Sequence, residues 1–196
     1  MTQSTTTPRI LAFAGSARRG STNRQLVAAA ARLADESGAS TTLVNLADFP
    51  MPIYDGDLEA SSGLPEHAVR LKRLMREHHG FLIACPEFNS SITPLLKNTI
   101  DWCSRPHGDE PGLACYTGKV AGLLAASPGA LGGLRGLVTV RSILSNIGVI
   151  VVPQQFALAK AHEAFNADGT LKDERQAQQL RDVSKAVVNL AGVLAR

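Results

Sequence analysis

The sequence predicts an α/β domain in which helices cover both faces of a parallel β-sheet. Short apolar runs that end in glycine or proline alternate with longer segments in which apolar residues recur every three or four positions. The first pattern is typical of buried strands and the second of helices that pack on them. The 196 residues contain no internal repeat or low-complexity linker. We therefore predict one domain over residues 9–196, preceded by a disordered tail over residues 1–8.

The first half of the chain opens with a strand and a helix. Residues 9–15 (RILAFAG) are apolar and end in glycine, which predicts the first strand. Residues 23–36 follow as a helix and residues 40–46 as a second strand. Residues 47–62 are rich in proline, glycine and aspartate, which predicts a long excursion outside the regular elements. A second helix over residues 64–79 leads back to the sheet.

The third strand covers residues 80–85 (GFLIAC), and Pro86 ends it. Thr93 and Pro94 predict the start of the next helix, because threonine is a favourable N-cap and proline is favoured at the first helical position. Residues 119–126 (KVAGLLAA) then form the fourth strand.

A glycine-rich turn leads from the fourth strand to a helix over residues 134–146, and residues 149–152 form a short, fully apolar fifth strand. The last helix covers residues 170–194 and begins at a capping box made by Thr170 and Asp173. Each of four predicted helices has its own row of apolar residues at helical spacing. These rows are Leu26, Ala30 and Leu33; Val69, Leu71 and Leu74; Leu96, Ile100 and Cys103; and Leu180, Val183, Val187, Leu190 and Leu194.

Five parallel strands with intervening helices fit a flavodoxin-like three-layer sandwich with the strand order 2-1-3-4-5. Right-handed crossovers place the switch point of this order between the first and third strands. Ligands of such sheets bind at the carboxyl ends of the strands beside that point. We therefore expect the site in the loops that begin at Gly15 and at Pro86.

The charge and the cysteines limit the classes of function. A net charge of +3 is too weak to indicate a nucleic-acid partner, but it is compatible with an anionic ligand such as a phosphate or NAD(P)H. The three cysteines form no C-x-x-C pair and no metal-ligand spacing, so we predict no metal site and a reducing, cytoplasmic location. Cys85 is expected to be buried in a strand and Cys115 to be accessible in a polar loop. No apolar run has the length of a membrane span.

The loop over residues 15–23 (GSARRGSTN) combines hydroxyls, arginines and glycines directly before a helix N-terminus. Backbone amides, short hydroxyl donors, a guanidinium and the positive end of a helix dipole together suit a phosphate dianion. In the alternative interpretation, Ser21 or Thr22 only caps the helix and the glycines only turn the chain. The G-x-G-x-x-G pattern is absent, and Ser21 stands where a P-loop has lysine, so a mononucleotide phosphate fits best.

The loop over residues 86–94 (PEFNSSITP) has a stiff start, an aromatic residue and several backbone amides. Such a loop suits the edge of a flat heterocycle, with a side chain packed on its face. The alternative is an ordinary strand-to-helix connection in which Glu87 is solvated and Phe88 lies in the core.

Two long motifs resemble a known family. Residues 15–26 (GSARRGSTNRQL) are similar to the G-S-x-R-x-x-S-x-N-x-x-L signature of the NADPH-dependent FMN reductases, which include bacterial quinone, chromate and azo-dye reductases. The segments PEFN and LKNTIDWCSRP, within residues 86–106, resemble the family's P-E-Y-N and L-K-N-A-I-D-W-x-S-R-P. The turn at residues 127–133 also resembles the family. Phe88 replaces the usual tyrosine, which keeps an aromatic face but removes a hydroxyl.

The resemblance implies FMN as the cofactor and NADPH or NADH as the electron donor. The residues implied to bind FMN are Ser16, Arg18, Ser21, Thr22 and Asn23 at its phosphate end, and Pro86, Glu87, Phe88, Asn89, Ser90, Ser127 and Gly129 around its ring. No side chain is expected to be catalytic, because the chemistry takes place at N5 of the flavin. Ile100 and Trp102 are expected in the core, and residues 47–62 and 107–117 are expected to wall the ring.

The function implied is transfer of electrons from NAD(P)H through FMN to a small acceptor such as a quinone, an azo compound, a metal oxyanion or free flavin. The resemblance also implies a homodimer or homotetramer. The alternatives are a non-catalytic electron carrier and a flavin-binding regulator. Catalytic consumption of NAD(P)H with a quinone distinguishes the enzyme from both.

Overall fold

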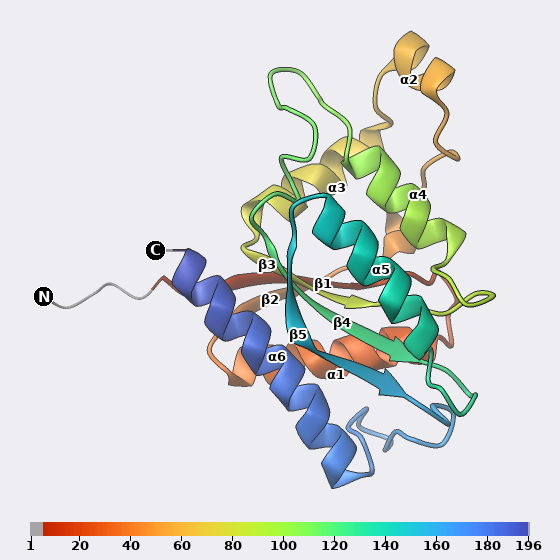
Figure 1. Ribbon diagram of the computed structural model, residues 1–196, viewed down its shortest axis with the longest axis vertical. Coiled ribbons are helices and arrows are strands. Elements are labelled where there is room, and N and C mark those ends of the chain that lie inside the picture. The colour runs from red at the N-terminus through yellow and green to blue at the C-terminus, as the bar shows by residue number, and fades with distance from the viewer. Residues whose placement is uncertain (1–5, 196) are drawn as a thin grey trace, which may run out of the picture.

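The computed structural model describes residues 6–195, and its centre is a five-stranded parallel sheet in the order β2-β1-β3-β4-β5 (Figure 1). This confirms the predicted strand order. The strands are β1 (Arg9–Ala14), β2 (Ser40–Leu43), β3 (Gly80–Ala84), β4 (Val120–Ala126) and β5 (Ile150–Leu158).

Helices cover both faces of the sheet, as predicted. On one face, α1 (Thr22–Glu36) and α6 (Glu174–Leu194) pack over a cluster that contains Ile10 and Ala12 of β1. On the other, α3 (Glu66–Glu77), α4 (Pro94–Cys103) and α5 (Leu134–Asn146) pack over a cluster that contains Leu11 and Phe13. Alternate residues of one strand therefore belong to opposite layers of the core.

The predicted N-terminal tail falls partly outside the described residues, because residues 1–5 are not among them. Pro8, at the end of that segment, is buried, and its carbonyl accepts a hydrogen bond of 2.8 Å from the Ser40 amide. The ordered fold therefore includes Pro8. Among residues 6–195, no helix combines the length and the apolar character that crossing a membrane requires.

Two predicted elements at the C-terminal end have different bounds in the structure. β5 runs on to Leu158, although the apolar run ends at Val152. Pro153 is tolerated there because β5 is an edge strand, where an amide need not serve the ladder. α6 begins only at Glu174, and its cap is Asp173, whose carboxylate accepts from the Gln176 amide at 2.8 Å.

Three of the predicted apolar rows are only partly correct. In α1, Leu26 and Ala30 are buried but Leu33 is only partly buried. In α6, Leu180, Val183 and Val187 are buried, but Leu194 is 49% exposed because the last turn extends past the sheet. In α3, the buried residues are Ala68, Leu71, Lys72 and Met75, whereas Val69 and Leu74 are only partly buried.

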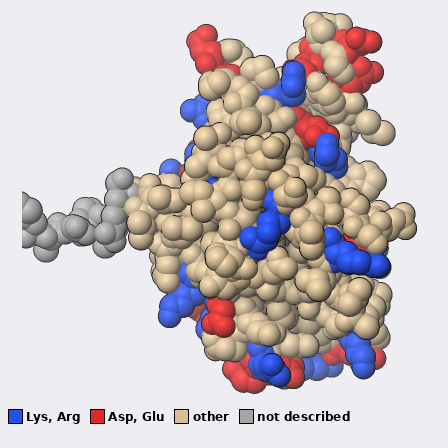
Figure 2. All heavy atoms as spheres, in the orientation of Figure 1, with Lys and Arg blue, Asp and Glu red and all other residues tan. Residues whose placement is uncertain are grey.

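Residues 47–62, predicted as an excursion, begin within a short 3-10 helix, η1 (Leu46–Asp48), and end in α2 (Gly56–Ser62), which buries none of its residues. We call residues 52–63 the arm. The arm projects beside α4 (Figure 1), and acidic side chains gather on it (Figure 2), among them Asp55, Asp57 and Glu59.

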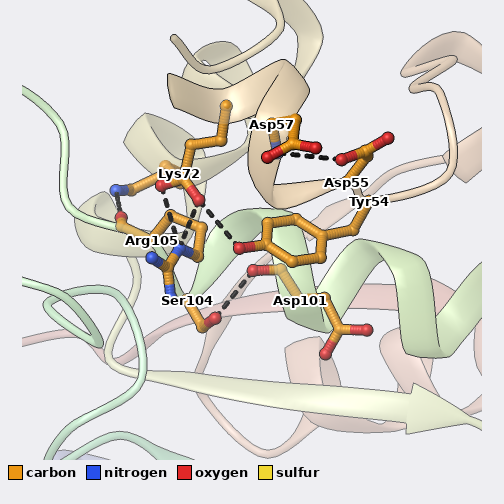
Figure 3. A network of polar contacts seen from close by, with 8 residues as sticks. Tyr54, Asp55, Asp57, Lys72, Asp101, Ser104 and Arg105 are labelled. Carbon is orange, nitrogen blue, oxygen red and sulfur yellow. Dashed lines mark hydrogen bonds and ion pairs between the residues drawn. The ribbon is translucent and has the colours of Figure 1, made fainter. Parts of the chain in front are cut away.

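A polar network fastens the arm to α3 and α4 (Figure 3). Glu59 accepts from the hydroxyl of Tyr54 and from Nε of Arg105, both at 2.8 Å. Lys72 of α3 donates to the carbonyl of Arg105, and the indole of Trp102 donates to the carbonyl of Pro52 at 2.8 Å. The hydrogen bond from Arg105 is the main cause that holds the pKa of Glu59 below its ordinary value.

The segment over residues 107–117 lies at the amino end of the sheet, not at the carboxyl end. Glu110 pairs with Arg76 near the end of α3, and the amide of Gly118 donates to the carbonyl of Gly148 just before β5. The prediction that this segment walls the ring is therefore wrong within this chain, because α4 has already returned the backbone to the opposite edge. Cys115 in this segment is completely buried, with its thiol directed at the carbonyl of Cys103 at 3.1 Å, so its predicted accessibility is also wrong.

Candidate functional site

The loops after β1 and β3 meet at the carboxyl edge of the sheet, where the topology predicts a ligand. The amide of Gly15 donates to the carbonyl of Ala84 at 2.9 Å, and Thr93, the N-cap of α4, donates to the carbonyl of Gly15 at 2.7 Å. A Cβ at position 15 would lie 2.9 Å from Cβ of Leu96. Only glycine therefore lets the first loop pack this closely on α4.

The loop over residues 16–22 presents the N-terminus of α1 to solvent. Ser21 is buried and its hydroxyl accepts from the Arg24 amide at 3.4 Å, so Ser21 caps α1, as the alternative interpretation proposed. The hydroxyl of Ser16 accepts from the Arg18 amide at 3.3 Å. The Arg18 side chain is exposed and forms no ion pair within residues 6–195, and Thr22 is half-buried. The guanidinium and the helix N-terminus thus remain available to an anion.

Asn23 connects this loop to the end of β4. Its side-chain amide donates to the carbonyl of Ala126 at 2.7 Å and accepts from the Ala126 amide at 2.9 Å, and the residue is only 4% exposed. Both ends of the side-chain amide therefore bind main chain that is 103 residues away in sequence.

The loop after β3 contains a tight turn. Phe88 and Ser91 exchange two backbone hydrogen bonds of 3.0 Å, and the central residues Asn89 and Ser90 have φ values of 50° and 66°. Left-handed backbone at two successive non-glycine residues carries a conformational cost. The turn leaves Phe88 57% exposed at its base, so the alternative in which Phe88 is a core residue is wrong.

Glu87 holds this loop against the start of α5. Its carboxylate accepts from Nε of Arg135 at 2.8 Å and from the Arg135 amide at 3.1 Å, and it also reaches the Gly136 amide. Burial by itself raises the pKa of Glu87, but the hydrogen bonds and charge of Arg135, with the Gly136 amide, outweigh it and leave the pKa below its ordinary value. The alternative in which Glu87 is simply solvated is therefore wrong.

Glu87→Gln is expected to lower the free energy of unfolding by about 1 kcal/mol at neutral pH, since it removes a charge-assisted contact whose arginine is exposed. The folded-state pKa lies below the unfolded value, so this contribution is complete above the unfolded pKa and is lost as pH falls through the folded pKa. Urea unfolding of both proteins between pH 3 and pH 7 measures it. A difference in stability that stays constant across this range contradicts the assigned role.

The turn after β4 completes the site. It encloses, with the β3 loop, a pocket of about 450 Å³. The described residues that line this pocket include four that the sequence singled out: Glu87, Asn89, Ser127 and Gly129. We call it the ring pocket. No residue of the arm or of residues 107–117 lines it. Ser127 accepts from the Gly129 amide at 3.2 Å, which shapes the turn.

The remaining predicted residues lie outside the ring pocket. Ser16, Arg18, Ser21, Thr22 and Asn23 lie on the β1 side of it, Pro86 is half-buried at the start of the β3 loop, and Phe88 and Ser90 are exposed on the turn. The structure therefore places five of the twelve predicted residues around the N-terminus of α1, four in the ring pocket and the other three on the β3 loop beside it, all at the same edge of the sheet.

Sequence reasoning missed Arg135, which lines the ring pocket and pairs with Glu87 at 2.6 Å. A cation in the first turn of a helix opposes the helix dipole. Arg135 lies in the first turn of α5, directly after the glycines of the turn. An arginine at this unfavourable position was the available signal that an anionic group lies opposite it.

The chain is similar to known proteins in both sequence and fold. The sequence model of the family described as NADPH-dependent FMN reductase matches residues 8–163. An NAD(P)H:quinone oxidoreductase of Solanum tuberosum is 34% identical over 93% of this chain and 92% of its own length. An NAD(P)H-dependent FMN reductase of Pseudomonas aeruginosa is 31% identical over 91% of this chain and 92% of its own length.

Among solved structures, the flavoenzyme NAD(P)H:(acceptor) oxidoreductase FerB of Paracoccus denitrificans superposes with a TM-score of 0.77. It is 28% identical, and the alignment covers 94% of this chain and 97% of that one. The family match covers most of the chain and includes both loops of the site. This chain belongs to the NADPH-dependent FMN reductase family.

Proposed function

We propose that the protein is an FMN-dependent NAD(P)H oxidoreductase that delivers electrons to a small acceptor of the quinone type. The observation that carries the proposal is the pairing of an anion-binding helix terminus with the ring pocket at one sheet edge. Relatives named as FMN reductase and quinone oxidoreductase over nearly their whole length support it.

FMN is a flat tricyclic ring joined to a phosphate dianion, and the residues fit both parts. The exposed Arg18 and the N-terminus of α1, where the Ser21 hydroxyl caps the Arg24 amide, suit the phosphate. A Cβ at Gly20 would meet no atom within 4 Å, so the loop keeps open space there. When bound, FMN supplies hydride-transfer and electron-transfer chemistry that amino-acid side chains lack.

The protein's own residues would position the flavin and stabilise the charge that develops on it. The Glu87–Arg135 pair fixes the β3 loop against α5. The amides of Phe88 and Ser91 are bonded to each other's carbonyls, so the amides of Asn89 and Ser90 are the ones that would meet a ligand. Main-chain N–H groups held in this way stabilise negative charge on a ligand's edge without reorganising. The exposed Phe88, on the β3 turn between two residues of the ring-pocket loop, offers an apolar face that would exclude water from an aromatic ring.

An FMN titration, followed by flavin fluorescence, tests the proposal. We expect saturable, stoichiometric binding by the wild type, and Arg18→Ala is expected to raise the dissociation constant about tenfold to a hundredfold, because it removes a charged contact to phosphate. Arg175→Ala, at an exposed arginine on α6, is the matched control and should leave the affinity unchanged.

Absence of binding at micromolar FMN contradicts the flavoenzyme assignment. Steady-state oxidation of NADPH or NADH with a quinone then separates an enzyme from the carrier and regulator alternatives, which bind FMN without sustained turnover.

We further propose that the protein forms a homodimer or homotetramer. Support comes from four large apolar side chains that are exposed on the β3 loop, the turn after β4 and α5: Phe88, Leu131, Leu134 and Val138. Light scattering after size exclusion is expected to show an oligomer in the wild type and a smaller species for Val138→Glu. A wild type that stays monomeric contradicts the proposal. The three free, buried cysteines also support the proposed cytoplasmic location, because they suit a reducing compartment.

A further inference from the structure

Another pocket, of about 410 Å³, lies between α1 and α6, which pack side by side on one face of the sheet (Figure 1). We call it the α1–α6 pocket. The α1 residues that line it begin at Ala29, about 10 Å along the helix axis from Thr22 in the first turn. No described residue lines both this pocket and the ring pocket, and none of the loops after β1, β3 and β4 reaches it. It is therefore separate from the candidate flavin site.

One wall of the α1–α6 pocket is a tight hairpin over residues 165–171, between β5 and α6. Phe165 and Leu171 pair across it as an antiparallel bridge. Nη2 of Arg32, on α1, donates to the carbonyl of Gly169 in the hairpin at 2.9 Å. Hydrogen bonds thus hold the wall both to itself and to α1, so the pocket has a defined shape.

The floor of the pocket is apolar. Ala29, Leu171 and Leu180 are buried core residues of this layer. Leu33 and Ala177 are only partly buried and pack against the same cluster. An apolar group placed on this floor would leave water and gain contacts with side chains from both helices.

The rim of the pocket carries an excess of positive charge. Its cations are Arg32, Lys172 and Arg181, and its carboxylates are Glu36 and Glu174. Arg181 pairs with Glu36 at 2.9 Å, whereas the other three take part in no ion pair within residues 6–195. Three cations against two carboxylates leave one positive charge for a ligand to balance.

The ligand that matches these features is a small organic monoanion. An inorganic anion would leave the apolar floor uncovered, and a dianion would exceed the charge of the lining. A neutral molecule would leave the excess charge of the rim unpaired. The volume is near the lower end of the range of about 300–1,000 Å³ that is typical of small-molecule sites, so the apolar body is small.

We propose that the α1–α6 pocket binds an organic carboxylate whose apolar body is about the size of two fused rings. Its carboxylate would lie between Arg32 and Lys172, and its body would cover Leu33 and Ala177. The proposal does not rest on the proposed function, because the two sites share no described residue. A ligand bound here is held apart from the ring pocket and is not an electron acceptor.

Equilibrium dialysis of the FMN-saturated protein tests the pocket without turnover. The probes are 2-naphthoate and 2-naphthamide, which have the same two rings and differ in charge, and their own fluorescence measures the bound fraction. We expect 2-naphthoate to bind saturably, one per chain, with a dissociation constant of about 1 mM or below. It should bind about threefold to tenfold more tightly than 2-naphthamide, because only the carboxylate pairs with the exposed cations.

Three variants assign the binding to this pocket. Lys172→Gln and Arg32→Gln should each remove most of the preference for 2-naphthoate, and Lys172→Gln does so without touching the bond that ties the hairpin to α1. Ala177→Leu should weaken both probes about tenfold or more, because the larger side chain occupies the floor without changing the charge. Lys185→Gln, at an exposed lysine of α6 outside the pocket, is the matched control and should change neither affinity.

Four results would overturn the proposal. These are no saturable binding of 2-naphthoate, equal affinities of the wild type for the two probes, unchanged binding by a folded Ala177→Leu protein, and a smaller mass of that variant in light scattering. The last result would make the pocket an interface between copies of the chain. Failure of the proposed function appears separately, as a wild type that binds no FMN or does not oxidise NAD(P)H.

Discussion

Gly132→Ala is expected to lower the free energy of unfolding by about 2–5 kcal/mol and to weaken FMN binding. Gly132 has φ of +61°, in the left-handed region, where a side chain is unfavourable. A Cβ there would lie 2.7 Å from the amide nitrogen of Ala159 and 2.7 Å from the carbonyl carbon of Leu158. Both neighbours are backbone atoms at the end of β5, so they cannot move aside as a flexible side chain can.

Gly132→Ala is expected to disturb the ring pocket as well as the stability of the fold. The turn containing Gly132 lines the ring pocket and is joined to β5 by a hydrogen bond of 3.1 Å from the Ser127 amide to the carbonyl of Leu158. Pushing the turn away from β5 therefore moves one wall of the ring pocket. Thermal unfolding followed by circular dichroism measures the stability, and an FMN titration of the folded fraction measures the pocket.

Gly129→Ala is the matched control in the same turn. Its added Cβ would meet only the Ser127 hydroxyl, at 3.6 Å, which is an ordinary contact. We expect a change in stability within about 0.5 kcal/mol. Equal melting temperatures for the Gly132 and Gly129 variants would show that the turn is free to shift and would contradict the argument from close packing.

The strand order was predictable because each central strand is an uninterrupted apolar run bounded by glycine or proline. α5 was predicted at its observed bounds, since its apolar period and the glycines before it agree. β5 was predicted too short because its second half, from Pro153 onward, contains the polar Gln154 and Gln155, which only an edge strand accommodates. The sequence pattern does not state in advance which strand will be at the edge.

The two loops that form the site were predictable, but the side-chain contacts that hold them in place were not. Topology places the loops after β1 and β3 at one edge, and hydrogen bonds between Gly15, Ala84 and Thr93 bear this out. The partner of Glu87 was not predictable, because Arg135 is 48 residues away and the pair depends on how α5 docks.

Asn23→Ala is expected to destabilise the protein by about 2–5 kcal/mol, because two buried hydrogen bonds disappear and leave main-chain groups of Ala126 without these partners. For a chain of this size, that lowers the melting temperature by about 5–15 °C. Asn23→Asp should not restore stability, since a carboxylate accepts from the Ala126 amide but cannot donate to its carbonyl. Gln25→Ala, at an exposed neighbour on α1, is the control.

The comparison of these variants with Arg18→Ala separates two roles for Asn23. The family resemblance implies that Asn23 contacts the FMN phosphate, whereas the structure shows it joining α1 to the end of β4. Arg18 is exposed, so its loss should weaken FMN binding with little effect on the melting temperature of the FMN-free protein. Asn23→Ala should lower that melting temperature first, and weaken FMN binding because the β1 loop and the turn after β4 are no longer held in register. An Asn23→Ala protein that melts like the wild type but fails to bind FMN would assign Asn23 to the phosphate alone.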